Sequence, residues 1–185
     1  MIDATRLPAQ VLLDTGVLIR ALGQRPQDPN APACIELWDA LIAKSRDIYI
    51  AAPSIAELLR FGLPLHVPLV SQVRVVAFDR VAAEECAKYF KYVDFQNASA
   101  NSGLPVTYYK YDALISACAL RAKVKTIVSL DDKLATRITN AGIPLIVHTP
   151  DFFQDQGQPS SPTAVQAPQA AAVQSTGSVA EPSKP

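Results

Sequence analysis

Four acidic residues stand where carboxylates could do chemistry: Asp14, Glu57, Asp112 and Asp131. Asp14 directly follows the apolar run at residues 11–13, and Asp131 follows the run TIVSL. Both are therefore expected where a strand ends, and open α/β sheets bind their ligands at the carboxyl ends of the strands. Carboxylates that crowd together repel one another unless cations neutralise them. A ligand set made only of oxygen atoms suits Mg²⁺ or Mn²⁺.

Each of these acids also has a purely structural explanation. Asp14 and Asp131 could cap helices, since aspartate is among the preferred N-cap residues. Asp112 opens the segment DALISACAL, and the helix dipole stabilises an acid in the first turn. Glu57 lies in the largely apolar segment SIAELLRFG and could occupy a solvated helix position. The functional interpretation depends on whether the four acids converge on one place.

The elements that would position these acids alternate along the chain. Strands are predicted at residues 11–13, 48–52, 73–78, 125–130 and 144–148. Helices are predicted at residues 15–22, 33–44, 53–62, 79–93, 108–122 and 131–142, with a loop at 97–107. Strands separated by helices indicate an α/β fold, in which helices cover both faces of a mainly parallel sheet.

The composition separates a domain at residues 1–153 from a tail. Residues 154–185 contain no aromatic residue and are rich in Pro, Ala, Gln and Ser, so we expect them to be disordered. Three widely spaced cysteines, Cys34, Cys86 and Cys118, are expected to be reduced thiols. The sequence shows no signal peptide and no apolar run near the roughly 20 residues that span a bilayer. These features predict a cytoplasmic protein without a membrane partner.

Five segments resemble, in order, the successive motifs of the PIN-domain nucleases: LLDTGVLI, PSIAELLRFG, YDALISACAL, TIVSLDDKL and PLIVHTPDFF. The resemblance covers residues 9–153 and is closest to the VapC-type toxins of toxin–antitoxin pairs. The ordered set with this spacing is a strong signal. It implies a PIN-like three-layer α/β/α fold with a mainly parallel central sheet.

The resemblance also implies roles for single residues. Asp14, Glu57, Asp112 and Asp131 become the first to fourth catalytic acids and the ligands of Mg²⁺ or Mn²⁺. Asp132 is an extra neighbouring acid, and the motif spacing favours Asp131 as the fourth ligand. The implied activity is that of a metal-dependent endoribonuclease, which hydrolyses RNA phosphodiester bonds as the toxin of a toxin–antitoxin pair.

Further residues are candidates for contacts around these ligands or with phosphate: Thr15, Ser129, Asp132 and Lys110. Ser129 stands where the family often has Thr, and the exchange keeps a hydroxyl. Gly16 stands where the family often has Asn, so any polar contact made by that side chain is missing.

Basic and aromatic side chains near the acids fit an RNA substrate. The candidate phosphate contacts, for which a solvated surface position is the alternative, are Arg20, Arg60, Lys110 and Lys133. Three tyrosines could stack on bases of single-stranded RNA or take part in packing: Tyr108, Tyr109 and Tyr111.

The implied partners are RNA, a small antitoxin protein and a second copy of the chain in a homodimer. Two alternatives stay open. The chain could be a PIN-domain nuclease of general RNA processing without an antitoxin, which the neighbouring reading frame would reveal. It could also be a catalytically inactive PIN-like interaction module, although such a module has no reason to keep four carboxylates together.

Overall fold

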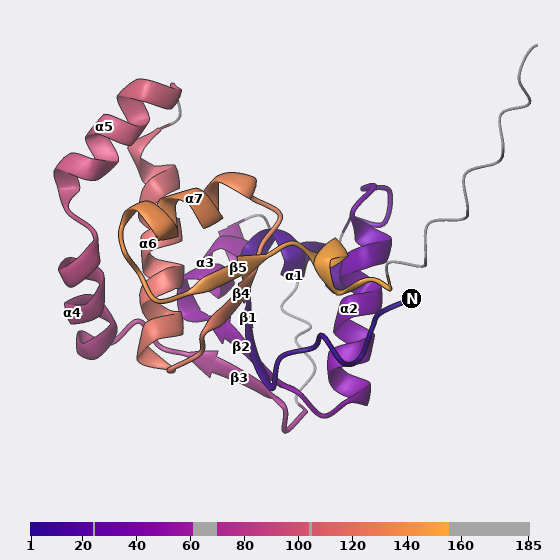
Figure 1. Cartoon of the computed structure of the whole chain (residues 1–185). Helices are drawn as coiled ribbons and strands as arrows, with labels where there is room; N and C mark the ends of the chain where they lie inside the picture. The colour runs from indigo at the N-terminus through magenta and orange to yellow at the C-terminus, as the bar shows by residue number, and fades with distance from the viewer. Residues whose placement is uncertain (24, 61–69, 104, 156–185) are drawn as a thin grey trace, which may run out of the picture. The chain divides into compact units, whose positions relative to one another are not determined.

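The computed structural model describes residues 1–23, 25–60, 70–103 and 105–155 (Figure 1). Within these residues, five strands pair in parallel in the order β3-β2-β1-β4-β5. The strands are β1 (Gln10–Leu13), β2 (Asp47–Ala51), β3 (Val73–Val76), β4 (Thr126–Val128) and β5 (Ile146–His148). The mainly parallel sheet expected from the sequence is confirmed.

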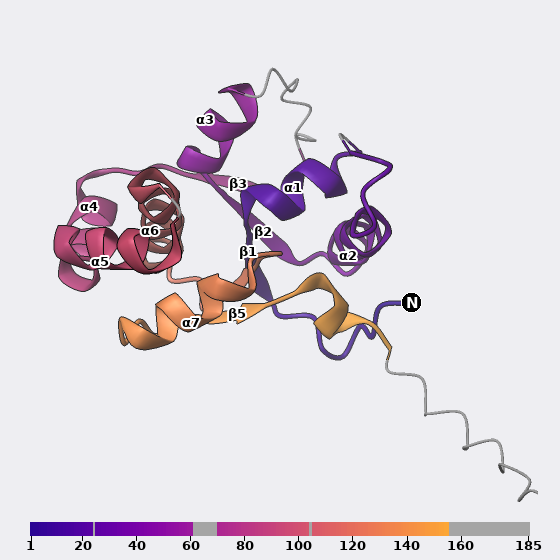
Figure 2. The same ribbon diagram turned by 90° about the horizontal axis from the view of Figure 1, so that it is seen from above.

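Helices cover both faces of the sheet (Figure 2). Side chains of α1, α2 and η1 join the hydrophobic cluster on one face, and side chains of α6 and α7 join the cluster on the other. Both α4 and α5 pack against α6. The helices are α1 (Thr15–Ala21), α2 (Ala31–Ala43), α3 (Ala52–Arg60), α4 (Arg80–Tyr89), α5 (Tyr92–Ser102), α6 (Val106–Arg121), α7 (Asp132–Asn140) and the 3-10 helix η1 (Pro150–Phe153). This is the three-layer α/β/α arrangement.

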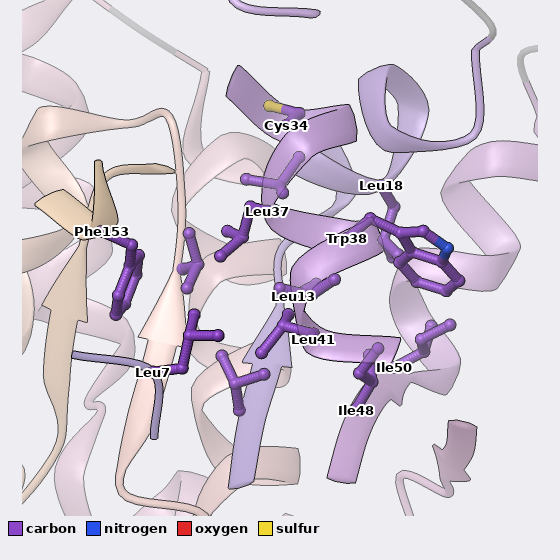
Figure 3. Close-up of a cluster of buried hydrophobic side chains, with 13 residues drawn as sticks. Leu7, Leu13, Leu18, Cys34, Leu37, Trp38, Leu41, Ile48, Ile50 and Phe153 are labelled. Carbon is purple, nitrogen blue, oxygen red and sulfur yellow. The ribbon is translucent and has the colours of Figure 1, made fainter. Parts of the chain in front are cut away.

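The central strand β1 is buried on both of its faces. Val11 and Leu13 belong to one hydrophobic cluster and Leu12 to the other, as the two-residue period of a strand requires. In the first cluster, Leu37 and Leu41 of α2 pack near Leu13 (Figure 3). Packing from both sides fixes the carboxyl end of β1, where the first acid follows.

The region after β3 differs from the prediction. Instead of one helix at 79–93 and a loop at 97–107, the chain forms α4 and then a second helix, α5. The backbone is extended at Phe90, and the Asp94 carboxylate accepts a hydrogen bond from the N–H of Lys91 (3.2 Å). The Asn- and Ser-rich segment has weak helix propensity, but its packing against α6 outweighs that preference.

Helix α6 begins at Val106, before the predicted start at residue 108. Asp112 lies in the second turn of the helix, and the first turn contains no acid. The helix dipole acts mainly within the first turn, so the first-turn explanation of Asp112 is wrong. Its place must have another cause.

The remaining expectations concern the cysteines, membrane-spanning helices and the end of the compact unit. The three cysteines are free thiols, of which Cys34 and Cys118 are buried. No helix in the described part of the chain is long and apolar enough to cross a membrane. The compact unit runs to Asp155, whose N–H donates to the carbonyl of Met1 (2.7 Å). The tail from residue 156 and the helix end predicted at Gly62 lie outside the described residues.

Candidate active site

A cleft of about 720 Å³ opens where the strands end. All four acids singled out in the sequence line it, although they come from four separate elements. Asp14 follows β1, Asp131 follows β4, Glu57 belongs to α3 and Asp112 belongs to α6. The fold thus brings to one place carboxylates that lie far apart in the chain.

Asp14 both caps helix α1 and lines the cleft. Its carboxylate accepts a hydrogen bond from the N–H of Thr15 (2.7 Å) at the start of α1, as the capping explanation proposed. Its other oxygen accepts from the hydroxyl of Ser129 (2.6 Å). The residue as a whole is partly exposed, but its carboxyl group is surrounded by protein atoms. Burial raises the pKa of Asp14, the two hydrogen bonds oppose this shift, and the nearby charges of Glu57 and Asp131 add to it.

Ser129 links the first and the fourth acid. Its buried hydroxyl donates to Asp14 Oδ2 and accepts from the N–H of Asp131 (3.0 Å). Because β1 and β4 are neighbours in the sheet, one side chain can reach both strand ends. Asp131 caps α7 by accepting from the N–H of Lys133 (2.9 Å), so the capping explanation describes part of its role as well.

Arg137 of α7 contacts two of the acids, and sequence reasoning did not single it out. Its Nη2 lies 2.6 Å from Asp112 Oδ2 and also forms an ion pair with Asp131 Oδ2. The Asp112 contact is a close approach of charges rather than a directed hydrogen bond. The guanidinium also lies over the ring of Tyr109, 5.4 Å from its centroid. One cation therefore holds α6 and α7 together beside the cleft.

The sequence carries a signal that could have identified Arg137. Leu134 and Ile138 form the buried stripe of α7, and Arg137 falls on the same side because residues three apart are neighbours on a helix. A charged residue on a buried helix face needs a partner of opposite charge. The acids at Asp112 and Asp131 are those partners.

Asp112 is a second acid of the cleft whose ionisation is strongly perturbed. Burial raises the pKa of Asp112 to about 7, although the positive charge of Arg137 opposes the shift. The negative charges of Asp14 and Asp131 raise it further. Acids whose pKa is shifted in a cleft are frequent at functional sites, although structural ion pairs shift pKa values too.

Helix α3 supplies part of the wall of the cleft. Glu57 and Arg60 both line it, and Arg60 Nη1 donates to the hydroxyl of Tyr111 in α6 (3.0 Å). Asp132 and Lys133 are exposed and line the cleft at the start of α7. The cleft therefore carries two basic side chains, Arg60 and Lys133, among its lining residues.

Other sequence candidates lie elsewhere. Arg20 is paired with Asp28 (2.6 Å) and donates to the carbonyl of Gly16 (2.8 Å), so its charge serves the α1 region. The hydroxyl of Thr15 is buried and has no hydrogen-bond partner in the described part of the chain. Lys110 is exposed and does not belong to the described lining of the cleft.

The three tyrosines of the YYKY segment have different surroundings. Tyr109 is buried and packs beneath the Arg137 guanidinium. Tyr111 is partly exposed and lines the cleft. The side chain of Tyr108 lies outside the described part of the structure.

The donor set of the cleft fits a hard divalent cation, since carboxylate oxygens are the ligands that Mg²⁺ and Mn²⁺ prefer. Among the described residues, no three histidine, cysteine or acidic side chains are grouped so as to hold an ion as they stand. Arg137 supplies positive charge to Asp112 and Asp131 in this arrangement. Binding of an ion would therefore require these side chains to turn toward it.

The fold and the cleft define a parallel α/β protein with a carboxylate-lined site at the carboxyl ends of its strands. The family model of the PIN domain matches residues 11–138, a range that includes all four acids, and the chain belongs to the PIN-domain family. PIN domains are generally nucleases. The chain is also similar to a chain in the crystal structure of VapBC2 from Rickettsia felis bound to a DNA fragment from their promoter. That similarity has 19% identity and a TM-score of 0.45, over 76% of this chain and 98% of the other. No match was found among curated protein sequences.

Proposed function

We propose that this PIN-domain protein is a metal-dependent endoribonuclease and the toxin of a toxin–antitoxin pair. The observation that carries the proposal is the convergence of Asp14, Glu57, Asp112 and Asp131 on one cleft. Helix capping explains the positions of Asp14 and Asp131, but no capping contact accounts for Asp112 in the second turn of α6.

In this proposal the four acids hold Mg²⁺ or Mn²⁺. The ion, when bound, lowers the pKa of a water molecule and stabilises charge on the attacking and leaving oxygens of a phosphodiester. Ser129 keeps Asp14 and Asp131 oriented by bonding to both. Arg60 and Lys133 on the cleft lining are placed to contact the phosphates of RNA.

The choice of RNA and of a toxin role follows from the motif resemblance to VapC-type toxins. It includes a small antitoxin partner, a homodimer and a cytoplasmic location. A PIN-domain nuclease of general RNA processing is the nearest alternative, and it would lack an antitoxin gene beside it. A catalytically inactive interaction module is the other alternative, and it predicts that no RNA is cleaved.

Cleavage of a structured RNA in Mg²⁺ or Mn²⁺ tests the proposal. The wild-type protein should cleave, and Asp14→Asn should lose the activity by orders of magnitude. Asn is also a preferred N-cap residue, so the variant should remain folded in circular dichroism. Asp39→Asn is the matched control, because Asp39 is exposed on α2 and absent from the lining of the cleft. Equal activity of Asp14→Asn and wild type would remove Asp14 from the active site.

A further inference from the structure

A second cavity of about 410 Å³ lies between the α4–α5 junction, α6 and α7. Three partly exposed aromatic side chains from α4, its C-cap and α5 line it: Tyr89, Phe90 and Phe95. Asp112 lines both this cavity and the acidic cleft. Arg137, which is ion-paired with Asp112, also lines the second cavity. The two cavities thus meet at one residue.

We propose that this cavity binds an unpaired base of the RNA substrate, next to the phosphodiester that is cleaved. The inference rests on the proposed ribonuclease function, because the cavity would bind the nucleoside next to the phosphate that is cleaved. A phosphate held at the acids has a nucleoside on each side. The shared residue Asp112 puts the aromatic cavity next to the acids, where one of those nucleosides must lie.

The lining of the cavity fits a base in shape and in polarity. Proteins recognise single-stranded RNA by stacking unpaired bases on aromatic rings and by hydrogen bonds to the base edges. The rings of Phe90 and Phe95 are stacked with their centroids 6.0 Å apart and their planes at 26°. Asn97 and Asn140 line the same cavity and are exposed. Their amide groups can both donate and accept hydrogen bonds, as base edges require.

The charges of the cavity favour a base over a phosphate. Among the described residues, its lining contains the acids Asp94 and Asp112 and one cation, Arg137. Arg137 already shares its charge between Asp112 and Asp131. A phosphate would therefore meet more negative than positive charge, whereas a neutral base avoids this cost. The cleft on the other side of Asp112, with Arg60 and Lys133 in its lining, suits the phosphate better.

The test measures binding apart from cleavage. Asp14→Asn protein is titrated, in Mg²⁺, into fluorescently labelled hexamers of uridylate, adenylate and cytidylate while anisotropy is recorded. Phe95→Leu is then introduced into the Asp14→Asn protein, where it removes one ring but keeps an apolar side chain. It should weaken binding by about fivefold or more, since base–aromatic stacking changes affinity by about 5- to 150-fold. Phe78→Leu is the control, because Phe78 is exposed and is not among the described lining residues of the cavity.

A second variant does not depend on the packing of the rings. Asn140→Ala changes an exposed residue at the end of α7, so the fold should persist. It should change the order of preference among the three hexamers and, in an otherwise wild-type protein, the base preferred at the cleavage site.

The outcomes separate this inference from the proposed function. One outcome is that wild type cleaves RNA, while Phe95→Leu and Asn140→Ala leave the RNA affinity and the base preference of the protein unchanged. In that case the proposed base site is wrong and the ribonuclease proposal stands. If wild type neither cleaves nor binds RNA, both fail. If Phe95→Leu keeps RNA affinity but loses affinity for the product of a neighbouring antitoxin gene, the cavity is a protein-docking site and the inference is overturned.

Discussion

Arg137 of α7 and Asp112 of α6 form an ion pair of 2.6 Å beside the acidic cleft, and the same guanidinium nitrogen contacts Asp131. The side chains of Arg137 and Asp112 are 18% and 16% exposed, so solvent screens the pair only in part. Breaking a largely buried pair by removing one partner is costly, because the remaining charge stays desolvated.

Arg137→Gln should therefore destabilise the metal-free protein by about 3 kcal/mol in urea unfolding with EDTA. A divalent cation can replace the lost positive charge, so Mn²⁺ should raise the stability of the variant more than that of wild type. Arg121→Gln is the control, since the pair of Arg121 with Asp79 lies at the surface and such pairs contribute about 0–1 kcal/mol. A loss no larger than that of the control would mean that Arg137 does not hold the acids.

The raised pKa of Asp112 makes stability depend on pH. The folded protein binds this proton up to about pH 7, whereas an unperturbed aspartate has a pKa of 3.8. Between these two values the folded state holds more protons than the unfolded state, so the free energy of unfolding falls as pH rises. The stabilising effect is complete below the lower value and lost above the upper one.

Asp112→Asn removes this dependence. The free energy of unfolding of the variant and of wild type is measured by urea unfolding without metal at two pH values. The difference, variant minus wild type, should be larger at about pH 8 than at about pH 5, by an amount on the order of a few kcal/mol. A relative stability that is larger at the lower pH would show that pairing with Arg137 outweighs the burial of the carboxylate.

Ser129 offers a test of orientation that does not remove an acid. Ser129→Ala loses the hydroxyl that bridges Asp14 and Asp131, and groups that orient metal ligands typically change metal affinity or activity by about 10- to 100-fold. Ser129→Thr keeps the hydroxyl and should retain most of the activity. The measurements are kcat/KM for RNA cleavage and the Mn²⁺ concentration for half-maximal rate. Equal activity of the Ala and Thr variants would deny the bridge a role.

Asp131 and Asp132 are adjacent acids with different surroundings. Asp131 contacts Arg137 and the Ser129 hydroxyl, whereas Asp132 is exposed in the first turn of α7. Asp131→Asn should abolish RNA cleavage, and Asp132→Asn should keep most of it and lose about 0.3–1 kcal/mol of stability through the helix dipole. Cleavage assays on the two variants decide between them. The reverse pattern would make Asp132 the fourth ligand.

The sequence by itself determined the sheet and the acids at its strand ends. Short apolar runs separated by amphipathic segments specify buried parallel strands, and this pattern is local, so the places of Asp14 and Asp131 could be predicted from it. The parallel topology then requires that strand ends on one edge lie near each other, which the cleft confirms for these two acids.

The tertiary structure alone decided how the helices complete the site. Asn- and Ser-rich residues before Gly103 have weak propensities, and it is contact with α6 that makes them the helix α5. The pairing of Asp112 with Arg137 joins residues of two different helices. Periodicity indicates which face of a helix is buried, but it does not specify which residue of another helix that face meets. That choice depends on how α6 and α7 pack on the sheet, so the pairing of this cation with Asp112 and Asp131 became visible only in the folded chain.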